Sequence, residues 1–209
     1  MLLKRRLLKK SKIYLILDTQ VNTYLELIDI VKKSVSAGVD IVQLRDKKGS
    51  ARDILEFSKK AIKIINRRAL FIINDRIDLS LLTFSDGVHL GQDDIPLKKA
   101  RKMIGKSKII GISCQTFKAA KEAERNGADY IGFGSVFKTL TKPERDQMSL
   151  KLLSRVAKNI KIPVFAIGGI NLKNVSCVKA CGIDRVAICR EICCTKDIKK
   201  LIENFRNTL

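Results

Sequence analysis

The 209-residue sequence lacks long apolar runs, and this excludes several classes of protein. The longest runs, such as Ile13–Leu17, are far shorter than the roughly 20 residues that a membrane-spanning helix needs. The N-terminal segment is basic, but its apolar residues are only pairs of leucine, too few for a secretory signal. We therefore expect a cytoplasmic protein that is not bound to a membrane.

Histidine is also scarce, and the sequence contains no recognisable zinc-binding motif. The sequence has one histidine, His89, and its six cysteines form no Cys-x-x-Cys pair. Cys177 and Cys181 lie four residues apart on a predicted helix, but a zinc site needs two more ligands to which the sequence does not point. We expect reduced, partly buried thiols in a reducing compartment.

Acidic residues are half as frequent as basic ones: 21 against 42, for a formal net charge of +21. Such an excess suits a protein that binds nucleic acid or an anionic membrane, or an enzyme with phosphorylated substrates. The lysines are spread over all the predicted helices rather than gathered on one face. We therefore interpret them mainly as a generally basic, solvated surface.

Eight short runs rich in Ile and Val alternate with amphipathic segments, as in an α/β protein with a parallel sheet. The Gly-x-Gly-x-x-Gly fingerprint of a doubly wound dinucleotide-binding sheet is absent after the first run. The sequence thus predicts a single-domain (β/α)8 TIM barrel over residues 13–209, after a basic tail over residues 1–12. The predicted strands are Ile13–Leu17, Val39–Leu44, Leu70–Ile73, Gly87–Leu90, Lys108–Ile112, Asp129–Phe133, Val164–Ile167 and Arg185–Ile188.

A short repeat marks three of the predicted junctions between a helix and the next strand. Gly-x-Asp occurs at 38–40, 127–129 and 182–184. Glycine suits the left-handed conformation that commonly ends a helix. The repeat therefore predicts equivalent junctions at these three places.

Polar side chains at the carboxyl ends of the strands are the candidate site, because barrel enzymes bind substrates there. In the second unit Gln43, Arg45 and Lys47 alternate, so they share one face of the strand. An amide and two cations on one face suit a diphosphate. The alternative is an exposed charge cluster at a strand end.

Acidic residues follow the third and fourth strands. Asp75 and Asp94 could hold one magnesium ion together with phosphate oxygens. The competing interpretation, equally supported by the sequence, is that they cap the next helices. His89 lies within its strand, and we interpret it as a core residue rather than a base.

Later strands end in residues that suit a phosphorylated ligand. Ser113 could donate to a ligand or cap the following helix. The loop after the sixth strand contains Thr139, Thr141 and Lys142, which suit a phosphate, although a plain flexible loop is the alternative. Gly168-Gly169 follows the seventh strand, where barrels often hold a phosphate on backbone amides.

In their order, these motifs resemble the thiamine-phosphate synthase family over nearly the whole chain from Ile13. The resemblance implies a Mg²⁺-dependent enzyme that joins a pyrimidine diphosphate to a thiazole phosphate. The pyrimidine C–O bond would ionise to a carbocation-like species and pyrophosphate before the thiazole nitrogen attacks. The motifs are Gln-Leu-Arg-Asp-Lys (43–47), Ile-Asn-Asp-Arg (73–76), Gly-Val-His-Leu-Gly-Gln-Asp-Asp (87–94), Gly-Ala-Asp-Tyr-Ile-Gly-Phe-Gly-Ser-Val-Phe (127–137), Thr-Leu-Thr-Lys-Pro (139–143) and Ala-Ile-Gly-Gly-Ile (166–170).

The resemblance also implies a role for each site residue. The magnesium carboxylates would be Asp75 and Asp94. Residues that contact the pyrimidine diphosphate would be Gln43, Leu44, Arg45, Asp46, Lys47, Asn74, Ser113 and Lys142. Residues that contact the thiazole phosphate would be Thr139, Leu140, Thr141, Gly169, Cys189 and Arg190. Of all these, Arg45, Lys47, Ser113 and Lys142 would act in catalysis.

The sequence departs from the family pattern in the thiazole half of the site. Family members usually have proline where Leu140 stands, and often where Lys138 stands. After the eighth strand Val-Ser or Ile-Ser is usual, and this chain has Cys189-Arg190. An arginine there could form an ionic contact with the phosphate or block the pocket.

Two other functions compete with this interpretation. A thiazole tautomerase shares the barrel but needs no diphosphate site, so the charged residues at the strand ends disfavour it. A nucleic-acid-binding protein would explain the sequence pI of 9.9, but not the polar strand ends, and we expect only weak non-specific binding. The sequence leaves open the oligomeric state, a homo-oligomer included, and which thiazole tautomer is the substrate.

Overall fold

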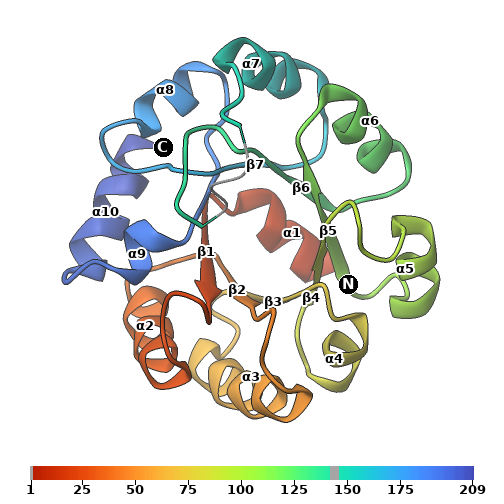
Figure 1. Ribbon diagram of the computed structural model, residues 1–209, viewed down its shortest axis with the longest axis vertical. Helices are drawn as coiled ribbons and strands as arrows, with labels where there is room; N and C mark the ends of the chain where they lie inside the picture. Colours follow the sequence, from red (N-terminus) through yellow and green to blue (C-terminus); the bar gives the residue numbers. More distant parts are fainter. Residues whose placement is uncertain (1, 142–145) are drawn as a thin grey trace.

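Eight parallel strands, each hydrogen-bonded to the next, form a barrel that closes where β8 pairs with β1. The computed structural model describes residues 2–141 and 146–209. It confirms the predicted (β/α)8 barrel, and Figure 1 looks along its axis. The strands are β1 (Ile13–Asp18), β2 (Ile41–Arg45), β3 (Leu70–Asn74), β4 (Gly87–Leu90), β5 (Ile109–Cys114), β6 (Tyr130–Phe133), β7 (Val164–Ile167) and β8 (Val186–Ile188).

A ring of helices surrounds the barrel (Figure 1). The most regular ones bury an apolar stripe and begin at a side-chain cap; in α2, for example, Thr23 accepts from the backbone of Glu26. None of the described helices is both long and apolar enough to cross a membrane. The helices of the ring are α2 (Tyr24–Ser36), α3 (Ala51–Ile65), α4 (Ile77–Leu82), α5 (Leu97–Ile104), α6 (Phe117–Arg125), α7 (Leu150–Asn159), α8 (Val175–Ala180), α9 (Arg190–Cys193) and α10 (Ile198–Thr208).

Alternating strand residues separate the apolar interior into two layers. In β1, Ile13, Leu15 and Leu17 pack against the helices, whereas Tyr14 and Ile16 pack inside the barrel. This alternation is the two-residue period of a strand, seen with both faces buried. The side chains on the inward face of each strand therefore form the interior of the barrel.

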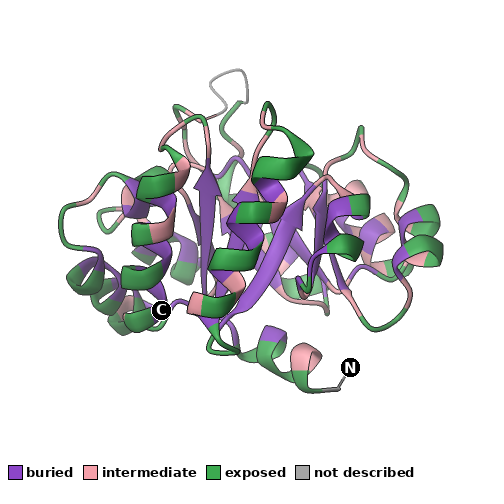
Figure 2. Ribbon diagram, turned by 90° about the horizontal axis from the view of Figure 1, so that it is seen from below, coloured by how far each residue is buried: buried purple, intermediate pink, exposed green. Residues whose placement is uncertain are grey.

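The segment expected as a basic tail begins with helix α1 (Leu2–Lys10), which lies across the amino ends of the strands (Figure 2). Leu8 is buried among the side chains of the barrel interior. Lys4 pairs with Asp86 at 2.8 Å, and Arg5 with Asp129 at 3.0 Å. Helix α1 thus closes this end of the barrel. The domain boundary at residue 12 stays a prediction.

Aspartates precede the four even-numbered strands at the same end: Asp40, Asp86, Asp129 and Asp184. Each of the first three accepts a 2.9 Å hydrogen bond from a backbone N–H of the preceding odd-numbered strand, at Ile13, Phe71 and Ile110 respectively. These aspartates therefore fix neighbouring strands together where the barrel begins.

The predicted Gly-x-Asp junctions are confirmed by their backbone conformation. Gly38, Gly127 and Gly182 have φ angles of +89°, +88° and +89°. A side chain would be strained in this left-handed conformation, so glycine ends each preceding helix. The three junctions are equivalent in structure as well as in sequence.

Candidate active site

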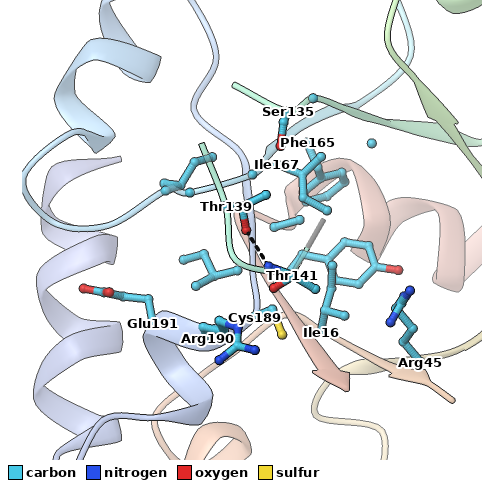
Figure 3. Close-up of a pocket in the computed structure, with 18 of the residues that line it drawn as sticks. Ile16, Arg45, Ser135, Thr139, Thr141, Phe165, Ile167, Cys189, Arg190 and Glu191 are labelled. Carbon is cyan, nitrogen blue, oxygen red and sulfur yellow. Dashed lines mark hydrogen bonds between the residues drawn. The ribbon is translucent and has the colours of Figure 1, made fainter. Parts of the chain in front are cut away.

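A cavity of about 300 Å³ opens at the carboxyl ends of the strands. Its floor includes the buried rings of Tyr14, Tyr130 and Phe165, which pack edge to face or tilted with centroids 5.4–5.8 Å apart. The loops after β6, β7 and β8 form one side of it, and Arg45 reaches it from β2 (Figure 3). The cavity therefore lies where the barrel architecture predicts a substrate site.

The second strand places Gln43 and Arg45 on the cavity wall, as their alternation predicts. Lys47 lies beyond the strand end, where its ammonium group contacts the carboxylate of Asp75. Leu44 faces the helix layer and is buried in the outer core. The structure thus brings two of the five predicted residues of this motif into the cavity and one into the neighbouring carboxylate cluster.

Asp46, also predicted to contact substrate, turns back into its own loop. Its carboxylate accepts from the backbone N–H groups of Lys48 at 2.9 Å and Gly49 at 2.6 Å, and it contacts the hydroxyl of Tyr24. The side chains of Leu44 and Asp46 do not line the cavity. The predicted substrate contacts at Leu44 and Asp46 would therefore have to come from their backbone groups.

Sequence reasoning missed Asp18, which controls the geometry of Arg45. Asp18 ends β1 and is fully buried, and its carboxylate accepts from the Arg45 guanidinium at 2.6 Å. A buried carboxylate needs such a partner. The signal was present in the sequence, because Asp18 shares the inward face of β1 with Tyr14 and Ile16.

Asp75 and Asp94 lie together beside the cavity. Their carboxyl groups are within hydrogen-bonding distance, and Lys47 contacts Asp75. Burial and then the Asp94 carboxyl raise the pKa of Asp75. Burial acts in the same direction on Asp94, but hydrogen bonds from Asp75 and from the Gly91 amide, at 2.6 Å, hold the pKa of Asp94 below its usual value. Of the two carboxyl groups, Asp75 therefore holds a proton more readily than Asp94.

Neither aspartate caps the helix that follows it. Helix α4 is preceded by Arg76 and α5 by Pro96, and neither helix has a side-chain cap. The capping interpretation is therefore wrong. Asp75 instead adopts a left-handed backbone conformation, with a φ of +59°, which aspartate tolerates better than most residues.

Two adjoining carboxylates fit a magnesium ion, which commonly takes one or two carboxylates and completes its shell with water and phosphate oxygens. Within residues 2–141 and 146–209, no group of three or more His, Cys, Asp or Glu side chains gathers into a larger metal site. The observed pair suits an ion that arrives with a phosphorylated substrate.

The loops after β6 and β7 approach each other so closely that only glycine fits between them. A Cβ atom on Gly168 would lie 2.1 Å from the Ser135 hydroxyl oxygen, and one on Gly169 would lie 2.2 Å from the Lys138 carbonyl oxygen. Both glycines also have positive φ angles, of +102° and +61°. The Gly-Gly pair is therefore required by packing as well as by its backbone conformation.

Residues predicted to bind the thiazole phosphate surround this contact. Thr139, Leu140, Thr141 and Gly169 line the cavity, and the Thr139 hydroxyl accepts from the Thr141 backbone at 3.3 Å. Figure 3 shows Thr139 and Thr141 beside this side of the cavity. Lys142 lies outside the described residues, and its role stays a prediction.

The departures after β8 also line the cavity. Cys189 is partly exposed, and the exposed Arg190 begins α9. In Figure 3, Arg190 and Arg45 lie on different sides of the cavity, with Ile16 between them. Asn171 and Glu191 line it too, and sequence reasoning did not single them out.

Buried polar groups link several strands across the floor. Gln43 donates to the Tyr14 hydroxyl at 2.6 Å, and the hydroxyls of Tyr14 and Tyr130 are 2.8 Å apart. His89 lies 3.0 Å from the Tyr130 hydroxyl through Nδ1 and 2.9 Å from the Ser113 hydroxyl through Nε2. Ser113 does not cap α6, since Thr116 does so.

Comparisons with known proteins identify the family of this chain. A model of the family described as thiamine monophosphate synthase matches residues 13–192. The thiamine-phosphate synthase of Fusobacterium nucleatum is 41% identical over 95% of this chain and 97% of its own length. That of Methanosarcina mazei is 42% identical over 97% and 85% respectively.

A solved structure supports the same assignment. Thiamine phosphate pyrophosphorylase from Pyrococcus furiosus superposes with a TM-score of 0.87 and 33% sequence identity. The alignment covers 98% of this chain and 96% of that one. The chain therefore belongs to the thiamine monophosphate synthase family and is an enzyme of that family.

Proposed function

We propose that the cavity joins a pyrimidine diphosphate to a thiazole phosphate, giving thiamine phosphate and pyrophosphate. The observation that carries this proposal is that two groups of residues suited to anions lie around one cavity. Arg45, with Lys47 and the aspartate pair beside it, forms one region. The Gly168-Gly169 contact with its threonine loop forms the other. Two phosphorylated substrates would thus meet between them.

The first region would hold the diphosphate of the pyrimidine substrate. Arg45 would bind a phosphate oxygen while Asp18 fixes its guanidinium. Lys47 would exchange part of its contact with Asp75 for the diphosphate. Asp75 and Asp94 would hold Mg²⁺, which when bound would stabilise negative charge on the phosphate oxygens. Lys142 would add a further cation, as the family resemblance implies.

The reaction needs charge stabilisation rather than a base. The C–O bond of the pyrimidine substrate breaks, and its electron pair leaves with the diphosphate. The thiazole nitrogen then gives its lone pair to the carbon, so no proton has to be removed before the new bond forms. The chain's task is to orient the two substrates and to stabilise the leaving group.

The aromatic rings of the floor would protect the carbocation-like carbon. Tyr14, Tyr130 and Phe165 are buried and packed against one another, which leaves little room for water beneath the substrates. Water there would compete with the thiazole nitrogen as a nucleophile. Asn74 and Gln43 would orient the pyrimidine at the edge of this floor.

The second region would hold the thiazole phosphate. The Gly169 amide and the Thr139 and Thr141 hydroxyls are neutral donors of the kind that surround phosphates. Cys189 would offer its backbone, and Arg190 would add a positive charge in place of the usual serine. Both substrates are charged and cannot diffuse through a bilayer, so we further propose that the enzyme works in the cytoplasm. We expect no specific nucleic-acid partner, because nucleic-acid binding would not explain the polar residues that line the cavity.

The direct test incubates the protein with both substrates and Mg²⁺ and measures thiamine phosphate and pyrophosphate. We expect both products in equal amounts. EDTA should abolish turnover, added Mg²⁺ should restore it, and Asp75→Asn should raise the Mg²⁺ concentration that is required. Full activity in EDTA would reject the metal assignment. Isomerisation of the thiazole without release of pyrophosphate would show a tautomerase instead.

A further inference from the structure

The hydrogen-bonded chain on the cavity floor has a direction that its donors and acceptors determine. It runs through Gln43, Tyr14, Tyr130, His89 and Ser113, with successive heavy-atom distances of 2.6, 2.8, 3.0 and 2.9 Å. The first four side chains are at most 8% exposed. Buried hydroxyls and ring nitrogens need partners, so each proton in this chain has a definite place.

The amide end fixes the direction. The Gln43 nitrogen can only donate, so the Tyr14 oxygen accepts from it. The Tyr14 proton then goes to Tyr130, its other partner, and the Tyr130 proton goes to Nδ1 of His89. In the opposite direction the buried Tyr14 would keep a proton with no acceptor among these partners, which costs free energy.

The direction of the hydrogen bond between His89 and Ser113 follows from the same reasoning. Because Nδ1 of His89 accepts, a neutral imidazole carries its proton on Nε2 and donates to the Ser113 oxygen. Ser113 accepts this hydrogen bond, so its own O–H does not donate to His89. Ser113 is partly exposed and lines the cavity, so its hydroxyl can donate to a bound molecule.

We propose that His89 is a positioning residue: held as the Nε2–H tautomer by Tyr130, it turns the Ser113 hydroxyl toward the cavity as a hydrogen-bond donor. Its partner would be an acceptor atom of the pyrimidine diphosphate, so this inference rests on the proposed function. With the tautomer reversed, Ser113 would donate to His89 and present lone pairs to an anionic substrate. The direction of the chain thus decides whether Ser113 attracts or repels that acceptor.

Packing alone does not require the hydroxyls of the chain. Phe165 occupies the same layer without one and contacts both tyrosine rings edge to face. Space for the chain is provided by glycine: a Cβ atom on Gly111 would lie 2.0 Å from the Tyr130 ring, and one on Gly132 would lie 3.3 Å from His89. Burial also raises the pKa of Tyr14 and of Tyr130, so both phenols keep their protons at neutral pH.

His89 is the only histidine in the sequence, so its ring can be observed directly. We would label the protein with ¹⁵N-histidine and record the ring nitrogens by NMR at neutral pH. The expected spectrum shows a protonated Nε2 and an unprotonated Nδ1. A proton on Nδ1, or on both nitrogens, would overturn the proposal. This measurement on the unmodified protein needs no variant and no turnover.

Tyr130→Phe tests the link to Tyr130. The variant should lose the preference for the Nε2–H tautomer, because Nδ1 loses its donor. Tyr24→Phe is the matched control. Tyr24 is the only tyrosine in the sequence that is not part of the hydrogen-bonded series, and its hydroxyl contacts Asp46 instead. It should leave the ring signals of His89 unchanged. An unaltered His89 spectrum in Tyr130→Phe would contradict the inference.

The link to Ser113 is tested by a double-mutant cycle. Tyr130→Phe should weaken binding of the pyrimidine diphosphate roughly tenfold, the effect of about one hydrogen bond, and leave the thiazole phosphate KM unchanged. In a Ser113→Ala background the same change should have almost no further effect. Additive losses would show that Tyr130 does not act through Ser113. Calorimetric titration with the pyrimidine diphosphate gives this result even if no thiamine phosphate forms, so failure of the proposed reaction is recognised separately.

Discussion

At the amino end of the barrel each aspartate before an even-numbered strand pairs with a cation, whereas at the carboxyl end Asp75 and Asp94 face each other. Asp129, for example, binds both Arg5 and Arg101, while the Asp75–Asp94 pair shares Lys47. Balanced charges hold strands together, and unbalanced ones leave a site that a metal ion or a substrate can complete. We therefore expect similar residues to serve stability at one end and, under the proposed function, chemistry at the other.

Removing a balanced charge should have the largest effect on stability. Asp129→Ala takes away a buried acceptor from Arg5, Arg101 and the Ile110 amide, so we expect a loss of roughly 3–5 kcal/mol in the free energy of unfolding. Activity per folded molecule should not change. Urea unfolding measures the first quantity, and the control Asp29→Ala, an exposed pair with Lys33, should lose less than about 1 kcal/mol. Equal losses in both variants would show that Asp129 does not fix the strands together at the amino end.

Removing a charge at the carboxyl end should affect turnover instead. Lys47→Ala should cost about 3 kcal/mol of transition-state stabilisation, or roughly a hundredfold in rate, with little change in the unfolding free energy. Lys142→Ala should behave alike. The exposed neighbour Lys48 is the control, and Lys48→Ala should keep normal rates. Normal turnover in Lys47→Ala and Lys142→Ala would place the diphosphate elsewhere.

The apolar contact of α1 offers a smaller test of the amino end. Leu8→Ala should destabilise the barrel by about 2 kcal/mol or somewhat more, because Leu8 is buried in the barrel interior. Leu3→Ala, on an exposed face of the same helix, should be nearly neutral. Thermal unfolding of both variants would show the difference, and similar midpoints would mean that α1 does not stabilise the barrel.

The smallest expected effect concerns Arg190, a departure from the family pattern. If its guanidinium binds the thiazole phosphate, Arg190→Ser should raise the KM for that substrate by about fivefold, or about 1 kcal/mol, and leave the pyrimidine diphosphate KM nearly unchanged. The effect should shrink as salt rises, because the residue is exposed. An unaltered or lower KM would favour a role for the backbone only, or partial blocking by the side chain.

Local patterns were sufficient to predict the barrel and part of its site. Runs rich in Ile and Val indicated where the strands lie, and the two-residue period of a strand placed Gln43 and Arg45 on one face. The same period places Asp18 on the inward face of β1. Its partner Arg45 is 27 residues away, and only the pairing of β1 with β2 brings the two side chains together. Tyr14 and Tyr130 are 116 residues apart and meet only inside the closed barrel.

Two other features also depended on tertiary structure. The apolar residues of α1 are two separate pairs of leucine among basic residues, so its sequence alone indicates a tail. The helix is held in place because Leu8 packs under the barrel, which the sequence does not reveal. His89 was interpreted as a core residue, and it is indeed buried, but it also links Tyr130 to Ser113. Burial and function are not alternatives at this position.

Closure of the barrel by Leu8 has a consequence for how substrates and products exchange during turnover. Helix α1 covers the amino end of the barrel, and in the described part of the chain the cavity opens at the carboxyl end. Substrates would therefore enter from the carboxyl end. Substrates and products would pass through the same opening. A product that stays in the cavity should consequently block binding of the next substrates, so we expect product inhibition in steady-state kinetics.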